Sequence, residues 1–300
     1  MPELPEVEVV RAGLEPAVTG ATISSVHVYD SRSLRRHPGP AEDFIGRLGS
    51  RILRAPERRG KFMWIPIEEP GGEPTHAIVV HLGMSGQVLL RDRTVDDSLT
   101  RIRLELDHPG HGELRLNFVD QRIFGSMAID ELVPTLDSPA QLVPASVSHI
   151  ARDPLDALFN ERAFFARLAK KNTTIKRAML DQTLISGIGN IYADESLWGA
   201  KIRYDQPTPT LSRPRAKLLL AEVRSVLNQA LAEGGTSFDT QYLNVNGQSG
   251  YFAHSLKVYG QQGKPCPRCG TLVVRESFMN RGSHFCPRCQ RLRNLASLAS

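Results

Sequence analysis

Four cysteines near the carboxyl end have the spacing of a metal site. Cys266 and Cys269 are separated by two residues, and after sixteen intervening residues Cys286 and Cys289 repeat that spacing. Two such pairs can place four thiolates at the corners of a tetrahedron, the arrangement that zinc favours in finger and ribbon modules. Four protein sulfurs leave no open coordination position, so the pattern predicts one structural zinc ion and not a catalytic metal.

The amino terminus offers a second kind of chemistry. Pro2 follows the initiator methionine, and a residue this small normally leads to removal of Met1. The resulting secondary amine has an ordinary pKa of about 8, well below that of lysine, so part of it is unprotonated and nucleophilic at neutral pH. Taken alone, a proline here also fits a purely structural role, and Glu3 and Glu6 suit a helix start.

A glycine turn between two apolar stretches is a candidate phosphate-binding element. Residues 187–195 read GIGNIYADE. A basic run precedes them at Lys170, Lys171, Lys176 and Arg177. Backbone amides at a turn before a helix can bind phosphate, and lysines suit a nucleic-acid backbone. By itself the turn fits an ordinary helix connection equally well, and it is not a Walker loop, because no Gly-Lys-Ser/Thr follows.

Two turns bounded by glycine carry side chains that could act on stacked bases. HLGMSG at 81–86 contains Met84, and DQRIFG at 120–125 contains Arg122 and Phe124. Exposed apolar and aromatic side chains, with an arginine between them, can enter a base stack and fill the space left by an extruded base. The turns alone do not decide, because methionine and phenylalanine are more often core residues.

Composition limits the class of protein. Three hundred residues with 41% hydrophobic side chains can form two domains, and the formal charge of +5 favours a polyanionic partner weakly. No apolar stretch is long enough to span a membrane, and the acidic amino terminus does not resemble a signal peptide. The local grouping of the cysteines argues against a disulfide framework. We therefore expect a cytoplasmic protein with no membrane partner.

The hydrophobic pattern predicts an α+β chain of several domains. Residues 1–130 alternate in short runs typical of strands, after a helix that begins near Pro5, and predict a sandwich or barrel. Residues 131–156 lack a clear period and predict a linker. Apolar positions three and four apart predict helices from 157 to about 235, followed by a polar connection that reaches 263. The cysteine module occupies 264–292.

Seven segments, taken in order, resemble the formamidopyrimidine-DNA glycosylase family of bacterial base-excision repair enzymes. They are PELPEVE at 2–8, RRGK at 58–61, HLGMSG at 81–86, DQRIFG at 120–125, GIGNIYADE at 187–195, GYF at 250–252 and the cysteine module with Arg281. The PELPEVE opening favours this family over the related endonuclease VIII. The resemblance implies an N-terminal β-sandwich as the catalytic domain, a helix-two-turn-helix domain with a lesion-recognition loop over 157–263, and a terminal zinc finger.

The resemblance also implies roles for individual residues. Pro2 would be the Schiff-base nucleophile and Glu3 its acid partner, while Lys61 and Arg281 would assist β- and δ-elimination. Residues implied to contact DNA are Met84, Arg122, Phe124, Arg167, Lys176 and Asn190. Glu6 and Glu195 would order the active-site pocket. The implied activity is that of a bifunctional glycosylase and AP lyase, which excises 8-oxoguanine and formamidopyrimidines from damaged double-stranded DNA.

Several positions depart from the family pattern. Gln121 and Ile123 stand in a motif that usually reads Asp-Pro-Arg-Arg-Phe-Gly, Leu99 lies near the place of a DNA-contacting histidine, and Asp239 replaces a lysine found in some relatives. These departures concern the contacts with the DNA strand and the choice among oxidised purines, and they leave the implied catalytic residues in place. Two alternatives remain at this point, a glycosylase for oxidised pyrimidines and a catalytically silent damage-binding protein. We expect a monomer associated with the bacterial nucleoid and no small-molecule cofactor other than zinc.

Overall fold

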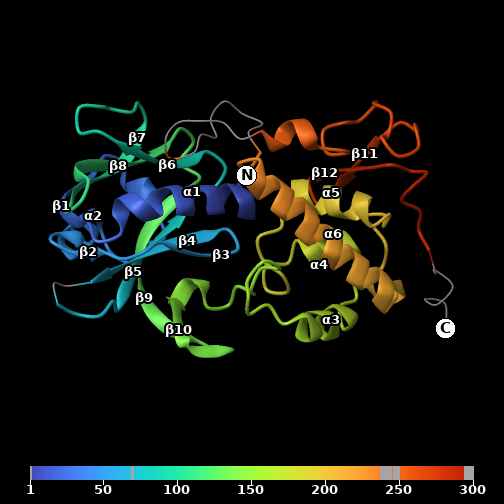
Figure 1. Ribbon diagram of the computed structural model, residues 1–300, viewed down its shortest axis with the longest axis horizontal. Helices are drawn as coiled ribbons and strands as arrows, with labels where there is room; N and C mark the ends of the chain where they lie inside the picture. The colour runs from blue at the N-terminus through green and yellow to red at the C-terminus, as the bar shows by residue number, and fades with distance from the viewer. Residues whose placement is uncertain (1, 69–70, 237–244, 246–250, 294–300) are drawn as a thin grey trace. The chain divides into compact units, whose positions relative to one another are not determined.

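The computed structural model describes the chain apart from residues 1, 69–70, 237–244, 246–250 and 294–300 (Figure 1). Two compact units form. The first comprises 1–149 with 234–250, and the second comprises 150–233 with 251–300. Asp239 and Gly250, which belong to the segments singled out above, lie outside the described residues. Within the described part of the chain, no helix combines the length and apolar character that crossing a membrane requires.

The first unit consists mainly of antiparallel strands. Its helices are α1 (Leu4–Val18) and α2 (Ala41–Leu48). Its strands are β1 (Thr22–Val28), β2 (Ile52–Leu53), β3 (Glu57–Arg59), β4 (Phe62–Glu68), β5 (His76–His81), β6 (Gly86–Arg91), β7 (Thr100–His108), β8 (Gly112–Asp120), β9 (Ser126–Thr135) and β10 (Ser138–Pro144).

The strands form a sheet that folds back on itself. Its order is β10-β9-β5-β4-β2-β1-β7-β8-β6, with β3 paired to β4. Only residues 82–85 join β5 to β6, and only 121–125 join β8 to β9, although each pair is far apart in this order. The sheet must therefore curve until its two parts face each other. Apolar side chains from both parts form one buried core, with α1 and α2 packed onto it, as expected for a β-sandwich.

Helix α1 begins where the sequence provides a cap. Glu3 and Glu6 form a reciprocal capping box, and Pro5 occupies the first turn, where its missing N–H costs nothing. Leu4, Val7 and the apolar residues that follow at three- and four-residue spacing face the core. This capping fixes the path of the chain immediately after Pro2.

The predicted linker over 131–156 differs from the structure. Strand β9 continues to Thr135, and β10 returns beside it as the outermost strand of the sheet. Three prolines, at 134, 139 and 144, conceal the strand pattern in the sequence. Pro139 and Pro144 are tolerated because β10 is an edge strand and need not donate every ladder hydrogen bond, and Pro134 lies on β9 beyond its pairing with β5, which ends at Glu131. The irregular connection is thus confined to the residues after β10.

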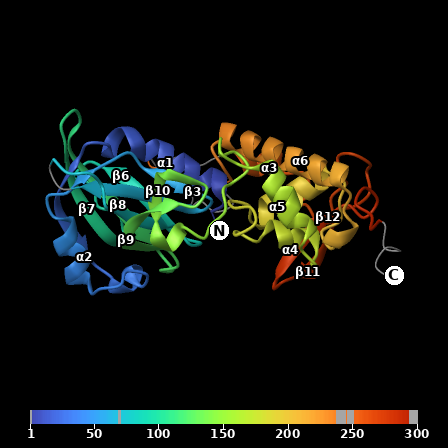
Figure 2. The ribbon, with the colours of Figure 1, turned by 90° about the horizontal axis from the view of Figure 1, so that it is seen from below.

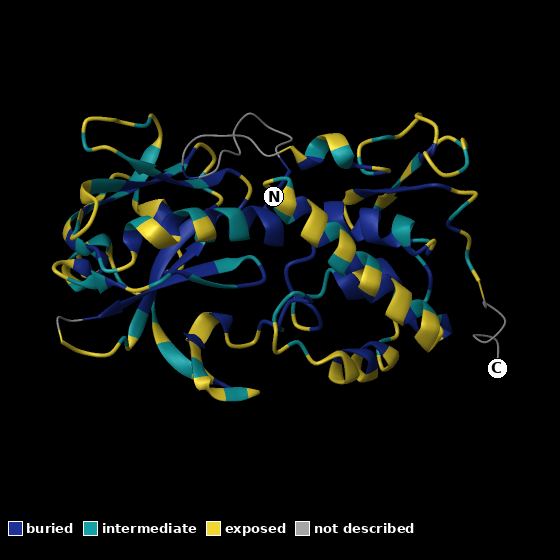
Figure 3. Cartoon of the chain, in the orientation of Figure 1, coloured by how far each residue is buried: buried dark blue, intermediate teal, exposed yellow. Residues whose placement is uncertain are grey.

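The second unit is helical and ends in a β-hairpin. Its elements are α3 (Glu161–Ala169), α4 (Ile175–Met179), α5 (Asn190–Gly199), α6 (Arg213–Ala232), β11 (Val274–Phe278) and β12 (Arg281–Phe285). The long helix α6 packs along α5 (Figure 2). Buried and exposed residues alternate along α6 with the helical period (Figure 3). Ser212 is the N-cap residue of α6, but its side chain makes no capping hydrogen bond.

Candidate functional site

The amino-terminal segment is held by a buried carboxylate. Pro2 and Glu3 are buried, and the Glu3 backbone N–H donates to Oε2 of Glu6 at 2.8 Å. The other oxygen of Glu6 accepts both the N–H and the hydroxyl of Thr236, each at 2.8 Å. Gly235, with φ +83°, brings the backbone against Glu6, where an added Cβ would come within 3.2 Å of Oε1. Glu6 therefore joins the start of α1 to a segment near residue 236.

Lys61 lies in a cationic cluster of the first unit. It occupies the tight turn between β3 and β4, which Gly60 makes possible with φ +59°, and it is half-buried. Burial, together with the positive charges of Arg36, Lys61 and Arg35, lowers the pKa of His81 to about 4. The imidazole is therefore neutral at physiological pH. Because Nδ1 accepts the Gly83 N–H at 3.1 Å, the proton resides on Nε2, which can donate to an anion.

The turns that contain Met84 and Phe124 are bound to each other within the first unit. Both side chains are 41% exposed, and the guanidinium of Arg122 lies 5.0 Å from the Phe124 ring centroid. Beneath them, the Ser85 hydroxyl donates to the buried Asp120 carboxylate at 2.5 Å. Three side chains that the resemblance assigns to base replacement thus project from one fixed support.

Lys176 does not have the surroundings of a phosphate ligand. Its side chain is 0% exposed, and Nζ lies 2.7 Å from Oδ1 of Asp194 and 2.7 Å from the Ser283 hydroxyl. A cation without exposed surface is not available to a phosphate in this arrangement, so the surroundings of Lys176 do not support the DNA contact implied for it, which stays a prediction. Its ammonium group instead joins α4 to α5 and β12 through these two contacts.

Asn190, at the start of α5, donates to the Gly282 carbonyl at 3.0 Å and is half-buried.

The remaining predicted residues of the second unit fall into two groups. Glu195 is buried, and its oxygens accept the N–H groups of 257, 258 and 259 at 2.8–2.9 Å. Burial raises the pKa of this carboxyl, and the three donors partly offset the increase. Arg167 and Arg281 are exposed; Arg167 donates to the Thr183 carbonyl at 2.5 Å, and Arg281 begins β12 directly after the hairpin turn. Both guanidinium groups can therefore meet a polyanion.

The four cysteines meet the requirements of a zinc site. Their sulfurs all lie within 4.8 Å of one another, and none forms a disulfide. Zinc–sulfur bonds of about 2.3 Å in a tetrahedron separate the sulfurs by roughly 3.8 Å, which this cluster can accommodate. The indole N–H of Trp198 points at Cys266 Sγ from 3.4 Å, the kind of outer-shell donor that stabilises a thiolate. The chain thus binds one structural zinc ion through Cys266, Cys269, Cys286 and Cys289.

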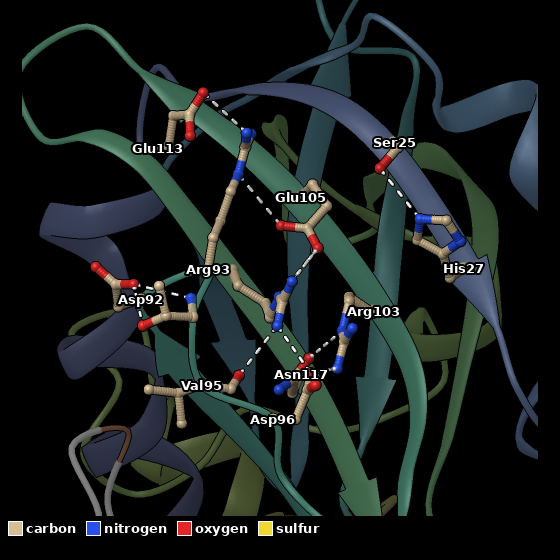
Figure 4. Close-up of polar contacts among 12 residues, drawn as sticks. Ser25, His27, Asp92, Arg93, Val95, Asp96, Arg103, Glu105, Glu113 and Asn117 are labelled. Atoms are coloured by element: carbon tan, nitrogen blue, oxygen red, sulfur yellow. Dashed lines mark hydrogen bonds and ion pairs between the residues drawn. The ribbon is translucent and has the colours of Figure 1, made fainter.

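An arginine-rich sheet face is excluded from the candidate DNA contacts. On β7, β8 and the adjoining loop, Arg93 pairs with Glu105 at 3.3 Å and with Glu113 at 2.9 Å (Figure 4). It also pairs with Asp107 at 2.8 Å. Arg103 and Arg115 are likewise paired with acids. Since each of these positive charges is offset within the face, the net charge of the chain says little about this surface.

Several residues that build the site carry no sequence signal of their own. Arg35, Arg36, His81 and Asp120 had no assigned role, although two of them stand inside quoted motifs. Their contacts join positions roughly ninety residues apart, as between Arg35 and Gly125. A sequence motif that combined the DQRIFG turn with the two arginines after residue 34 could have indicated Arg35, Arg36 and Asp120. Leu99 is exposed with φ +66°, and its carbonyl accepts the Asp120 N–H at 3.2 Å.

Comparison with protein families accounts for most of the chain. Residues 1–127 match the formamidopyrimidine-DNA glycosylase N-terminal domain, 150–242 match the H2TH domain of the same enzymes, and 263–292 match a zinc finger found in FPG and IleRS. The formamidopyrimidine-DNA glycosylase of Leifsonia xyli is 66% identical over 97% of this chain and 100% of its own. That of Streptomyces coelicolor is 51% identical over 97% of this chain and 98% of its own.

Solved structures give the same result. The Lactococcus lactis Fpg protein in complex with DNA containing an abasic site is similar with a TM-score of 0.80 and 28% identity, over 96% of this chain and 99% of that one. A point mutant of the same protein, bound to DNA containing Fapy-dG, has a TM-score of 0.81 at 28% identity, over 97% of this chain and 100% of that one.

Proposed function

This chain belongs to the formamidopyrimidine-DNA glycosylase family, and from that premise we propose that it excises oxidised purines and then cleaves the strand as an AP lyase. Membership makes it a DNA glycosylase that acts on damaged DNA. The purine preference is supported by the Fapy-dG in the complex of the Lactococcus lactis protein. The lyase step is supported by the amino terminus of this chain, and we propose that the active form is a monomer.

The proposed reaction begins at Pro2. After removal of Met1, the secondary amine attacks C1′ of the deoxyribose, and the damaged base departs with the electrons of its glycosidic bond and takes up the proton that the amine loses. Glu3 delivers a proton to the ring oxygen as the sugar opens, which leaves an iminium on the proline nitrogen. The feature that carries this assignment is the position of Pro2 directly before a capped helix whose Glu6 is fixed on both oxygens.

Elimination follows from the iminium. Loss of a C2′ proton expels the 3′ phosphate, and a second elimination expels the 5′ phosphate. Lys61, in its cationic turn, serves proton transfer in the first step, and Arg281, exposed at the start of β12, stabilises phosphate in the second. DNA contacts come from Met84, Arg122, Phe124, Arg167 and Asn190, while Glu6 and Glu195 each order the backbone of their own unit.

Borohydride trapping tests this proposal. The processed protein is mixed with a duplex containing 8-oxoguanine opposite cytosine, reduced, and analysed by peptide mass spectrometry. We expect an adduct on Pro2 that is absent with an undamaged duplex. A matched protein that retains an amino-terminal tag should give no adduct, because its proline nitrogen is an amide. An adduct at another residue, or none with processed protein that binds DNA, would contradict the lyase mechanism.

A second candidate substrate class is the oxidised pyrimidines. One solved structure of the Lactococcus lactis protein, with 28% identity to this chain, contains an oxidised pyrimidine in its DNA. Excision rates on thymine glycol and on 8-oxoguanine, measured side by side, separate the two preferences. A catalytically silent binding protein would release neither base.

A further inference from the structure

We propose that Arg35 is a positioning residue that fixes the shape of the 120–125 turn and thereby presents Arg122 and Phe124 to the DNA duplex. The proposal deepens the proposed function and rests on it, because it concerns how this glycosylase opens a base pair. Arg35 stands outside every motif of the resemblance and directly follows the short 3-10 helix Ser31–Leu34.

The guanidinium of Arg35 binds three consecutive carbonyl oxygens. Nη1 donates to Ile123 at 3.0 Å and to Gly125 at 2.6 Å, while Nη2 donates to the carbonyl of Phe124. Three successive carbonyls can meet one planar group only if the backbone turns sharply around it. The rigid fork of donors makes arginine suited to this task, and lysine, with a single point of charge, is a poor substitute.

Asp120 binds the backbone N–H groups of the same turn. Its fully buried carboxylate accepts the N–H groups of Arg122 at 3.2 Å, Ile123 at 3.0 Å and Gly125 at 2.7 Å. The turn is therefore fixed between an anion that collects its amides and a cation that collects its carbonyls. Side chains at 122 and 124 take no part in this clamp and remain exposed.

Ile123 shows why such a clamp is needed. Its φ of +55° lies in the left-handed region, which is strongly disfavoured for a β-branched side chain. A residue persists there only when its surroundings over-determine the backbone. The family motif has arginine at this position, which tolerates the conformation better than isoleucine does. This chain thus carries a strained residue between its two inserting side chains and depends on Arg35 and Asp120 to hold it.

The turn at residues 82–85 lies directly against the 120–125 turn. An added Cβ on Gly83 would come within 2.3 Å of the Phe124 backbone, so the two turns are in direct backbone contact. Ser85 joins them again through Asp120. Release of the Arg35 contacts would allow Ile123 to relax to ordinary dihedral angles. The Phe124 backbone would then move against the turn that carries Met84, and the base-replacing side chains would lose their common arrangement.

A substrate pair separates positioning from catalysis. Single-turnover excision from a lesion duplex requires base replacement, whereas cleavage of a single-stranded oligonucleotide with a preformed abasic site does not. For Arg35→Ala we expect duplex excision to fall about tenfold and single-strand cleavage to stay within about twofold of the parent. Arg35→Lys should recover only part of the duplex rate. Arg32→Ala is the matched control, because Arg32 is an exposed neighbour bound to Asp30 and should change neither rate.

A double variant distinguishes positioning from a direct phosphate contact. Glycine accepts positive φ without strain, so in an Ile123→Gly background the loss caused by Arg35→Ala should shrink to about threefold or less. Equal losses in both backgrounds, or unchanged duplex excision by Arg35→Ala, would overturn the inference. A parallel loss on single-stranded abasic DNA would also overturn it. If the parent protein itself cleaves no abasic DNA and gives no borohydride adduct, the proposed function fails instead.

Discussion

The 120–125 turn and the Lys176 cluster both lie in segments that the family resemblance links to DNA, yet they use charge in opposite ways. In the turn, charged groups bind the backbone and leave the side chains at 122 and 124 exposed. In the cluster, Lys176 pairs with Asp194, and both side chains are 0% exposed. Charge beside a DNA-binding motif can therefore stabilise the fold itself, as Lys176 does here.

The same contrast extends to the source of stability. The 120–125 turn belongs to a unit with a large apolar core, and its contacts are made within that unit. The Lys176 cluster depends on β12, which belongs to the hairpin beside the cysteines, where the buried apolar cluster is small. Zinc must supply the folding free energy that this small cluster lacks.

Zinc removal is expected to have the largest effect and to separate the two regions. Chelation, or Cys286→Ser, removes an interaction that contributes on the order of 10 kcal/mol in finger peptides. Hydrogen exchange should show loss of protection at 281–285, while 120–125 keeps its protection. Loss of protection in both regions at once would show that the two units do not fold independently.

Replacement of Asp194 is the next largest change. Asp194→Ala leaves a buried lysine without its partner and should destabilise the protein by about 3–5 kcal/mol in urea unfolding. The double variant Lys176→Met with Asp194→Leu should recover part of that loss, because a buried ion pair contributes little net stability over apolar packing. Recovery is incomplete because the buried His284 N–H, which donates to Asp194 at 2.9 Å, loses its acceptor.

A half-buried pair serves as the control for Asp194. Lys171 and Asp181 lie 2.7 Å apart near the surface, so Lys171→Ala should cost less than about 1 kcal/mol. If Asp194→Ala were equally mild, Lys176 would have another route to solvent or to a partner, and the contrast between the two regions would weaken.

The lowered pKa of His81 predicts that the stability of the first unit depends on pH. Its pKa falls from 6.5 in the unfolded chain to about 4 in the folded protein, so the unfolded state binds more protons between these values. Stability contributed by the neutral imidazole is present above pH 6.5 and is lost as the pH falls towards 4, by about 3 kcal/mol at most. His81→Gln should flatten the urea-midpoint profile over this range; an unchanged slope would contradict the depressed pKa.

Truncation of the exposed aromatic side chain should have the smallest effect on stability. Phe124→Ala removes a group that is 41% exposed and outside the clamp, so the unfolding free energy should change by about 0.5 kcal/mol or less. Lesion excision from duplex DNA should nevertheless decline. A large loss of stability would show that Phe124 supports the fold and does not serve base replacement.

Local patterns in the sequence predicted the parts of the molecule that depend on local physics. The zinc ligands follow from spacing, helix α1 from its cap and apolar period, and the strands of the first unit from alternation. The β9–β10 hairpin was missed because prolines interrupt its pattern. Burial of Lys176 was missed because its partner Asp194 lies one helix away, and nothing in either neighbourhood indicates that the two meet.

The role of Arg35 illustrates the same limit over a longer range. Its three acceptors are backbone carbonyls, which have no residue-type signature, and they lie about ninety positions away along the chain. Ile123 was noted as a departure from the family motif, but its positive φ became visible only with the backbone. The replaced lysine position at Asp239 remains a prediction, since it lies outside the described residues.

The contacts of Glu6 form in two stages as the chain is synthesised. Its anchor, Thr236, lies 230 residues further along the chain, so the amino terminus leaves the ribosome long before its binding partner exists. During that interval residues 2–6 are open to the enzyme that removes the initiator methionine. Once Thr236 has been made, Glu6 is bound on both of its oxygens and holds the start of α1. The amino terminus is therefore less constrained while the chain is being made than after Glu6 has bound Thr236.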